Sequence, residues 1–222
     1  SGQALLIDTQ GKFGFSHLLL FGLGEEKGLE LDSLRRFGGA ASRIASSLRC
    51  PSFSISADIR SFKADQSVQA VCEGILLSDY KPIKFKTKKD EYFDVPKAVI
   101  LSASTASSAL DKGMILAIAQ NYVRDINESP ANIATPQLLA EEARKLGKEN
   151  RLSVAVLEKS DLKRMKMNSI LAVNAGSELP PVLVTLEYNK DRKDLPFYAV
   201  IGKGITFDSG GISIKPSDHM EA

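Results

Sequence analysis

Two lysines and one aspartate stand close together near the end of the chain, in the string GKGITFDSGGISIKP. Lys203 comes directly after a short apolar run, Asp208 follows five residues later, and Lys215 comes seven residues after that. Gly210 and Gly211 lie between Asp208 and Lys215, where glycine lets the backbone turn sharply and pass close to a ligand. One carboxylate between two amines suits either a salt-bridged turn or a metal site.

Three other glycine-rich motifs do not fit this string. A phosphate-binding loop of the form GxxxxGK[ST] needs glycine where Phe197 stands and Ser or Thr where Gly204 follows the lysine. The dinucleotide fingerprint GxGxxG and the nucleophile elbow GxSxG both need glycine at Phe207. Phosphate-loop, dinucleotide and serine-nucleophile chemistry are therefore not indicated here.

Metal binding suits the residue types that remain. A carboxylate such as Asp208 ligates hard or borderline divalent cations, whereas a lysine ligates only as the neutral amine. A nearby divalent charge and burial both favour the neutral amine, so Lys203 beside Asp208 is coherent at a site that holds two metals. From the residues alone, a solvated salt bridge stays open as the alternative.

The same string resembles the signature of the leucyl aminopeptidase family, also called cytosol aminopeptidases, which are two-metal exopeptidases. Two earlier strings also resemble motifs of this family. They are INESPANIATPQLLAEEA at residues 126–143 and ILAVNAGSELPPVLVTLEY at residues 170–188. Three matches in order and at sensible spacing argue strongly against coincidence.

The resemblance implies a role for each residue of the group. Lys203 and Asp208 correspond to metal ligands, with Asp208 contacting both metals, and Lys215 corresponds to a catalytic lysine that polarises the scissile carbonyl. The implied cofactors are two divalent ions: zinc, with manganese or magnesium as the alternative at one site. The family's remaining ligands, an Asp, an Asp-x-Glu pair and a catalytic Arg, follow downstream of Ala222, so this chain supplies only part of the site.

The implied function is a metal-dependent aminopeptidase that releases N-terminal amino acids, with a leucine-type preference, by a water activated between two metals. The resemblance also implies peptide substrates with a free N-terminus and a homo-hexamer. We expect this chain alone to be inactive. The alternative, from another class, is a non-catalytic fragment or relative with a structural or assembly role, and the downstream ligands separate the two.

Composition narrows the class of protein. With 222 residues, 43% of them hydrophobic, the chain can bury a sizeable core in one or two domains. A net charge of +2 gives no field for nucleic acid or an anionic membrane, so neither partner is expected. The basic run at residues 81–89 is followed at once by acidic residues, and we interpret it as a solvated loop or strand face.

Cysteine usage and the absence of long apolar runs predict a cytoplasmic protein. Cys50 and Cys72 lack metal-type spacing and are interpreted as reduced, buried thiols. No apolar run reaches transmembrane length, and the first residues carry neither the basic nor the long apolar region of a signal peptide.

Apolar periodicity predicts an α/β fold with a small N-terminal α/β domain, a linking helix and the start of an α/β metallopeptidase catalytic domain, incomplete in this chain. The Ser/Thr/Ala-rich residues 102–108 mark the boundary. The expected domains are residues 1–105, the linking helix 106–130 and the catalytic part 131–222. We expect a largely parallel first domain, with strands 17–24, 53–59 and 98–104 and helices 32–49 and 67–77.

The second half continues the alternation. Asp32 is the expected N-cap of the first helix, and Thr135 followed by Pro136 is expected to begin a helix over residues 137–148. A buried strand at residues 197–201 is expected to deliver Lys203, since ligands bind at the carboxyl ends of strands in open α/β sheets. The other predicted elements are helices 109–127 and 161–167, strands 152–157 and 181–188, and a short apolar segment at 170–174.

Overall fold

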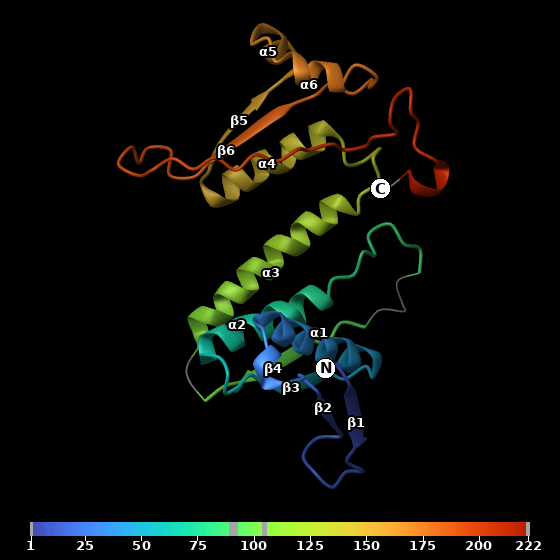
Figure 1. Cartoon of the computed structure of the whole chain (residues 1–222), viewed down its shortest axis with the longest axis vertical. Helices are drawn as coiled ribbons and strands as arrows, with labels where there is room; N and C mark the ends of the chain where they lie inside the picture. The colour runs from blue at the N-terminus through green and yellow to red at the C-terminus, as the bar shows by residue number, and fades with distance from the viewer. Residues whose placement is uncertain (1, 89–92, 104–105, 221–222) are drawn as a thin grey trace. The chain divides into compact units, whose positions relative to one another are not determined.

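The structure is a computed structural model that describes residues 2–88, 93–103 and 106–220 (Figure 1). Contacts divide the chain into two compact units, Ser1–Glu128 and Ser129–Ala222. The first unit contains β1 (Ala4–Asp8), β2 (His17–Phe21), a 3-10 turn (Glu26–Gly28), α1 (Leu31–Ser47), β3 (Ser52–Ser56), α2 (Ala64–Ser78), β4 (Lys97–Leu101) and α3 (Ser107–Asn127). The second contains α4 (Pro136–Asn150), β5 (Ser153–Leu157), α5 (Lys159–Arg164), α6 (Asn168–Val173), β6 (Leu183–Glu187) and a 3-10 turn (Ser217–His219).

The chain is an α/β protein, as expected, but its first unit is not largely parallel. The strands β1 and β2 pair antiparallel, with Ala4 opposite Phe21, whereas β3 and β4 pair parallel, with Ser52 opposite Lys97. The reason lies in the connections. A short loop between β1 and β2 allows only antiparallel pairing, while the helix α2 between β3 and β4 provides the long crossover that a parallel pair needs.

The core of the first unit forms where α2 packs against α1 and α3 (Figure 1). Leu34 of α1 and Val71 of α2 are fully buried in it. The two helices approach so closely that a Cβ atom on Gly74 would lie 2.0 Å from the carbonyl oxygen of Arg35. Glu73 is buried beside this contact, and both of its carboxylate oxygens accept hydrogen bonds, from Arg35 Nε at 2.6 Å and Gln69 Nε2 at 2.7 Å. A buried charge with both oxygens bonded is compatible with a stable core.

Of the two predicted helix caps, the cap of α4 is correct and the cap of α1 is wrong. Leu138 N–H donates to Thr135 Oγ1 at 3.2 Å and Pro136 is the first residue of α4, so the predicted cap of this helix is confirmed. The predicted cap of α1 is wrong, because Glu30 is its N-cap and Asp32 lies in the first turn. Asp32 instead pairs with Arg36 one turn later, at 3.0 Å, an arrangement that also suits an acidic residue near a helix N-terminus.

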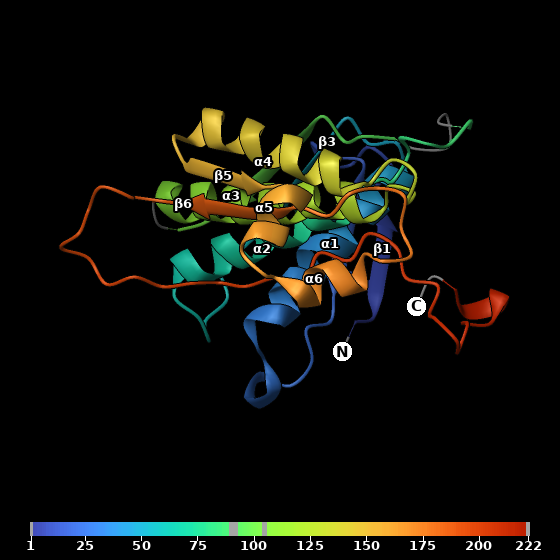
Figure 2. The ribbon, with the colours of Figure 1, turned by 90° about the horizontal axis from the view of Figure 1, so that it is seen from above.

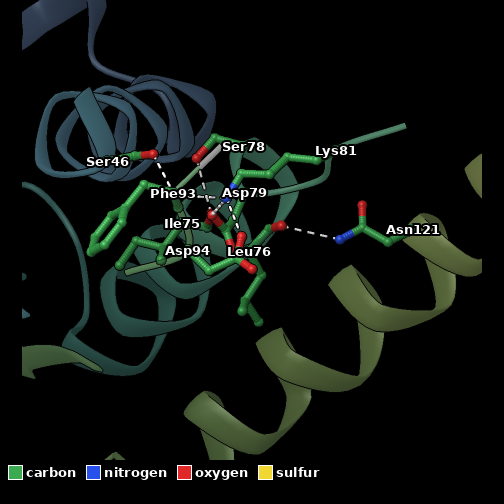
Figure 3. Close-up of polar contacts among 9 residues, drawn as sticks. All are labelled: Ser46, Ile75, Leu76, Ser78, Asp79, Lys81, Phe93, Asp94 and Asn121. Atoms are coloured by element: carbon green, nitrogen blue, oxygen red, sulfur yellow. Dashed lines mark hydrogen bonds and ion pairs between the residues drawn. The ribbon is translucent and has the colours of Figure 1, made fainter. Parts of the chain in front are cut away.

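Lys81 holds the loop between α2 and β4 (Figure 3). The prediction that this lysine is solvated is wrong, because its side chain is mostly buried. Its side chain is 13% exposed, and Nζ donates to Asp79 at 3.1 Å, to the Phe93 carbonyl at 2.8 Å and to Asp94. Burial opposes the lysine's charge, but the hydrogen bonds to Asp94 and Asp79 outweigh it and raise the pKa of Lys81. Ser46 of α1 donates to the same Phe93 carbonyl at 2.6 Å.

The rest of the predicted basic run behaves differently from Lys81. Lys84, Lys86 and Lys88 are exposed, as expected, and Lys89 lies outside the described residues. Sequence spacing could not show this difference, because Asp94 and the Phe93 carbonyl reach Lys81 only when the loop folds back.

The second unit is built on the antiparallel pair β5–β6, against which α4 packs (Figures 1 and 2). Both strands fall where sequence predicted them, and the 161–167 helix is observed as α5. The short apolar segment at 170–174 is helical, as part of α6. Gln137 Nε2 donates to the Pro180 carbonyl at 2.9 Å and joins the start of α4 to the segment that leads into β6.

The domain boundaries of the sequence analysis stay predictions. The contact division falls after Glu128 and groups α3, the expected linking helix, with the first unit. Among the described residues, no helix combines the length and the apolar character needed to cross a membrane.

Replacing Gly74 with alanine is expected to destabilise the first unit by about 2 kcal/mol or more, because the new methyl group would meet backbone atoms that cannot move aside. Urea unfolding followed by circular dichroism measures the change. Gly28→Ala is the matched control, since a Cβ there meets no atom within 4 Å. Equal unfolding midpoints for both variants would contradict the close approach of α1 and α2.

The two cysteines are expected to react at different rates. Both are free thiols; Cys50 is partly exposed and Cys72 is 4% exposed, with its Sγ donating to the Leu110 carbonyl at 3.8 Å. Burial, and secondly the charge of Glu73, raise the pKa of Cys72 from its usual 9.0 to about 11. Such a rise lowers the thiolate fraction near neutral pH by roughly 100-fold.

A chromogenic disulfide reagent should therefore label Cys50 rapidly and Cys72 slowly in the native protein. The Cys50→Ser variant should retain only the slow phase, and urea should convert that phase into a fast one. Fast labelling of native Cys50→Ser protein would show that Cys72 is not enclosed by α2 and α3.

Candidate metal centre

The segment that carries the predicted site is not a buried strand. Residues 197–201 form neither helix nor strand, and Phe197 is 81%, Val200 100% and Ile201 94% exposed. The predicted strand is therefore wrong for this structure. The segment is irregular because it lacks a partner. A strand needs a neighbour for its backbone N–H and C=O groups, and none of the described strands pairs with this segment.

A compact turn follows, and it is closed by the backbone alone. Gly210 and Ile214 form an isolated antiparallel bridge, and Lys215 N–H donates to the Ser209 carbonyl at 2.9 Å. Gly210 has a φ of +85°, in the left-handed region that residues with a side chain seldom adopt. The turn thus forms from local contacts, without a neighbouring strand.

Asp208 is tied into this turn through its side chain. Its Oδ1 accepts a hydrogen bond from Gly210 N–H at 2.9 Å, which is the geometry of an Asx turn. The carboxylate is exposed, and within the described part of the chain Oδ2 has no hydrogen-bond partner. One carboxylate oxygen is fixed by the backbone, and the other is available to a cation.

The structure brings two of the three predicted residues to the same turn. Asp208 and Lys215 stand at its two ends, joined through the hydrogen bond from Lys215 N–H to Ser209. Lys203 is exposed, and among the described residues no hydrogen bond or ion pair links it to Asp208. The salt-bridge alternative therefore has no support between Lys203 and Asp208.

The donor set fits part of a metal centre and does not complete one. The carboxylate of Asp208 and the amine of Lys203 are ligand types that a divalent ion accepts once the amine is neutral. In the ranges that the structure describes, no group of three or more His, Cys, Asp or Glu residues could hold a metal ion. Stable zinc sites use three or four protein ligands, so further ligands are needed.

Sequence reasoning missed two features of this region. The first is the left-handed Gly210, although an aspartate two residues before a glycine was a usable signal for an Asx turn. The second is the bidentate ion pair between Arg192 and Asp194, with Nε–Oδ1 and Nη2–Oδ2 distances of 2.8 and 2.7 Å. Their mutual hydrogen bonds raise the pKa of Arg192 and lower that of Asp194, in the exposed turn just before the site segment.

Comparison with known proteins agrees with the α/β fold and with the site motif. Residues 1–89 match the family model "Cytosol aminopeptidase family, N-terminal domain", and residues 121–222 match "Cytosol aminopeptidase family, catalytic domain". Both matched models describe domains of one family, and together they span most of the α/β fold and the whole site motif. The chain belongs to the cytosol aminopeptidase family.

Curated relatives cover nearly the whole chain. A probable cytosol aminopeptidase of Persephonella marina is 35% identical over 225 residues, which is 99% of this chain and 45% of the relative. Another from Exiguobacterium sibiricum is 37% identical over 203 residues, 91% of this chain and 41% of the relative. The chain therefore spans less than half the length of these two relatives.

Solved structures share the fold of both units. The bottromycin maturation enzyme BotP in complex with Mn has a TM-score of 0.82 at 27% identity and covers 99% of this chain and 46% of its own. A mutant of tomato leucine aminopeptidase has a TM-score of 0.74 at 26% identity, covering 83% of this chain and 37% of its own. The α/β fold, with an N-terminal domain and part of a catalytic domain, is thus shared with leucine aminopeptidase-like proteins.

Proposed function

We propose that the whole protein is a metal-dependent aminopeptidase that removes N-terminal amino acids, with a leucine-type preference, from peptides. The observation that carries the proposal is the Asp208–Lys215 turn, which lies inside the segment matched to the family's catalytic domain and leaves Asp208 Oδ2 without a hydrogen bond from the described residues. The relatives support peptide substrates and aminopeptidase activity. The turn supports the roles proposed below for individual residues.

Within this proposal Lys203 and Asp208 would hold the metals. The bound ions would activate water and polarise the scissile carbonyl. Two divalent ions are proposed, zinc or, at one site, manganese or magnesium, and the structural neighbour solved with Mn supports a site of this kind. The Gly210 N–H keeps Asp208 Oδ1 in place, so that the carboxylate needs little reorganisation to bind a cation.

Lys215 has a different proposed role. As a cation at the other end of the turn, its ammonium would donate a hydrogen bond to the carbonyl oxygen as negative charge develops there. Its backbone N–H donates to the Ser209 carbonyl, one residue from Asp208, so both side chains start from the same turn. The substrate's free amine would bind one of the metal ions, which explains why only N-terminal residues are released.

We also propose that the whole protein is cytoplasmic and forms a homo-hexamer. The proposed parts of this chain are the N-terminal domain 1–105, the linking helix 106–130 and the catalytic part 131–222. The names of the relatives support the location. A second function, a structural or assembly role without catalysis, is the alternative for this chain alone, and two observations favour it. The described residues hold no group of three or more His, Cys, Asp or Glu that could bind a metal ion, and the chain spans less than half of the relatives.

This chain expressed alone should bind zinc weakly and release no product from a leucine amide, because Lys203 and Asp208 are fewer ligands than a stable site needs. Turnover with added zinc or manganese measures this. A protein extended by the residues that follow position 222 in the relatives is the positive control. Clear metal-dependent hydrolysis by the chain alone would contradict the account of the missing ligands.

Substitution of the two lysines in the extended protein should separate their roles. Lys203→Arg should lose bound metal, because guanidinium stays protonated and has no lone pair to donate. Lys215→Ala should keep its metal and lower turnover by roughly 100-fold or more, the scale of losing one oxyanion stabiliser.

Metal analysis of each purified variant, beside its steady-state kinetics, tests this pair of roles. The exposed Lys193, which precedes the site segment, provides the matched control as Lys193→Ala. Full metal occupancy and full activity in Lys203→Arg would remove the ligand role of Lys203.

A further inference from the structure

We infer that Gly210 is a positioning residue of the proposed site: its N–H holds one carboxylate oxygen of Asp208, and its left-handed backbone closes the turn that brings the backbone of Lys215 back to Ser209. This inference rests on the proposed function. It concerns a residue that touches neither metal nor substrate and acts through Asp208 and Lys215.

The first step is steric. Gly210 has a φ of +85°, and a Cβ built on it would lie 2.3 Å from the Ser213 carbonyl oxygen and 3.3 Å from the Lys215 nitrogen. Both atoms belong to the backbone of the same turn, so they cannot move aside as the end of a flexible side chain can. An L side chain at this position is therefore excluded by the turn as well as by its φ angle.

The second step is the hydrogen bond to the carboxylate. Gly210 N–H lies 2.9 Å from Asp208 Oδ1, and this contact selects one orientation of an otherwise exposed side chain. Hydrogen bonds to a carboxylate are among the stronger ones in proteins, so this orientation is favoured over the others. Oδ2 is left as the oxygen that meets a cation. This N–H lies before the φ bond of Gly210, so a change of φ alone would redirect the residues that follow. Relief of the Cβ clash by rotation at Ser209 would turn the N–H away and free the carboxylate to rotate.

The third step links Asp208 to Lys215. The bridge between Gly210 and Ile214 and the hydrogen bond from Lys215 N–H to the Ser209 carbonyl close one small ring of backbone. Opening the turn at Gly210 would therefore displace the carboxylate and the lysine relative to each other. Because a misplacement of about 1 Å can lower turnover about 100-fold, a single methyl group here should have a large effect.

The neighbouring glycine provides a matched control. Gly211 is adjacent in sequence, but its φ lies outside the left-handed region and a Cβ there meets no atom within 4 Å. A role that required only a small or flexible residue would make both glycines sensitive. The structure instead makes Gly210 obligatory and Gly211 replaceable.

The experiment compares Gly210→Ala and Gly211→Ala in the protein extended by the residues that follow position 222 in the relatives. Zinc affinity is measured by titration calorimetry with zinc alone, and kcat and KM are measured on a leucine amide per folded molecule. Gly210→Ala should weaken zinc binding about 10-fold or more and lower kcat about 100-fold with little change in KM. Gly211→Ala should stay within about threefold of the parent in each quantity.

The outcomes separate this inference from the proposed function. Equal zinc affinity and kcat in the two variants would overturn the positioning role, and a lower unfolding midpoint alone would reduce Gly210 to a structural residue. A parent that binds zinc without hydrolysing the amide would overturn the proposed function, while the zinc affinities would still decide the role of Gly210. A parent that does neither would overturn both.

A measurement on the unmodified extended protein covers the case in which Gly210→Ala does not fold. Amide hydrogen exchange with nitrogen-labelled glycine should show slow exchange at Gly210, whose N–H is bonded to Asp208, and fast exchange at Gly211. Equally fast exchange at both positions would overturn the inference.

Discussion

Pairing of backbone N–H and C=O groups is the constraint on which this structure depends. β1 with β2, β3 with β4, and β5 with β6 satisfy it in three separate pairs. Residues 197–201 have the apolar composition of a buried strand and no partner among the described strands, and they remain irregular with Val200 and Ile201 exposed. Composition gives a strand its preference, but a neighbour must supply its hydrogen bonds.

The candidate site escapes this constraint because its geometry is local. The Asx turn at Asp208, the left-handed Gly210 and the hydrogen bond between Lys215 and Ser209 all lie within a few residues of one another. None of these contacts needs a neighbouring strand. Lys203 follows the unpaired segment directly, and its position relative to Asp208 therefore depends on strand pairing that the described residues do not provide.

In the first unit, a buried carboxylate is accommodated between closely packed helices. Gly74 lets α1 and α2 approach, and the buried Glu73 beside it is satisfied by Arg35 and Gln69. Lys81 applies the same principle at the loop that follows α2, where two carboxylates and a carbonyl surround a mostly buried ammonium. Both groups join segments distant in sequence, and neither belongs to the site.

The sequence by itself determined the helices and the motif. Periodic apolar residues located α1 to α4, Thr135 and Pro136 marked the start of α4, and the string around Asp208 pointed to the family, because these signals are local or written in residue identity. Tertiary structure decided the antiparallel pairing of β1 and β2, the cap of α1, the burial of Lys81 and the unpaired state of residues 197–201. The pairing, the burial and the unpaired strand depend on which distant segment lies alongside. The cap of α1 depends on a competition between Glu30 and Asp32 that residue types leave undecided.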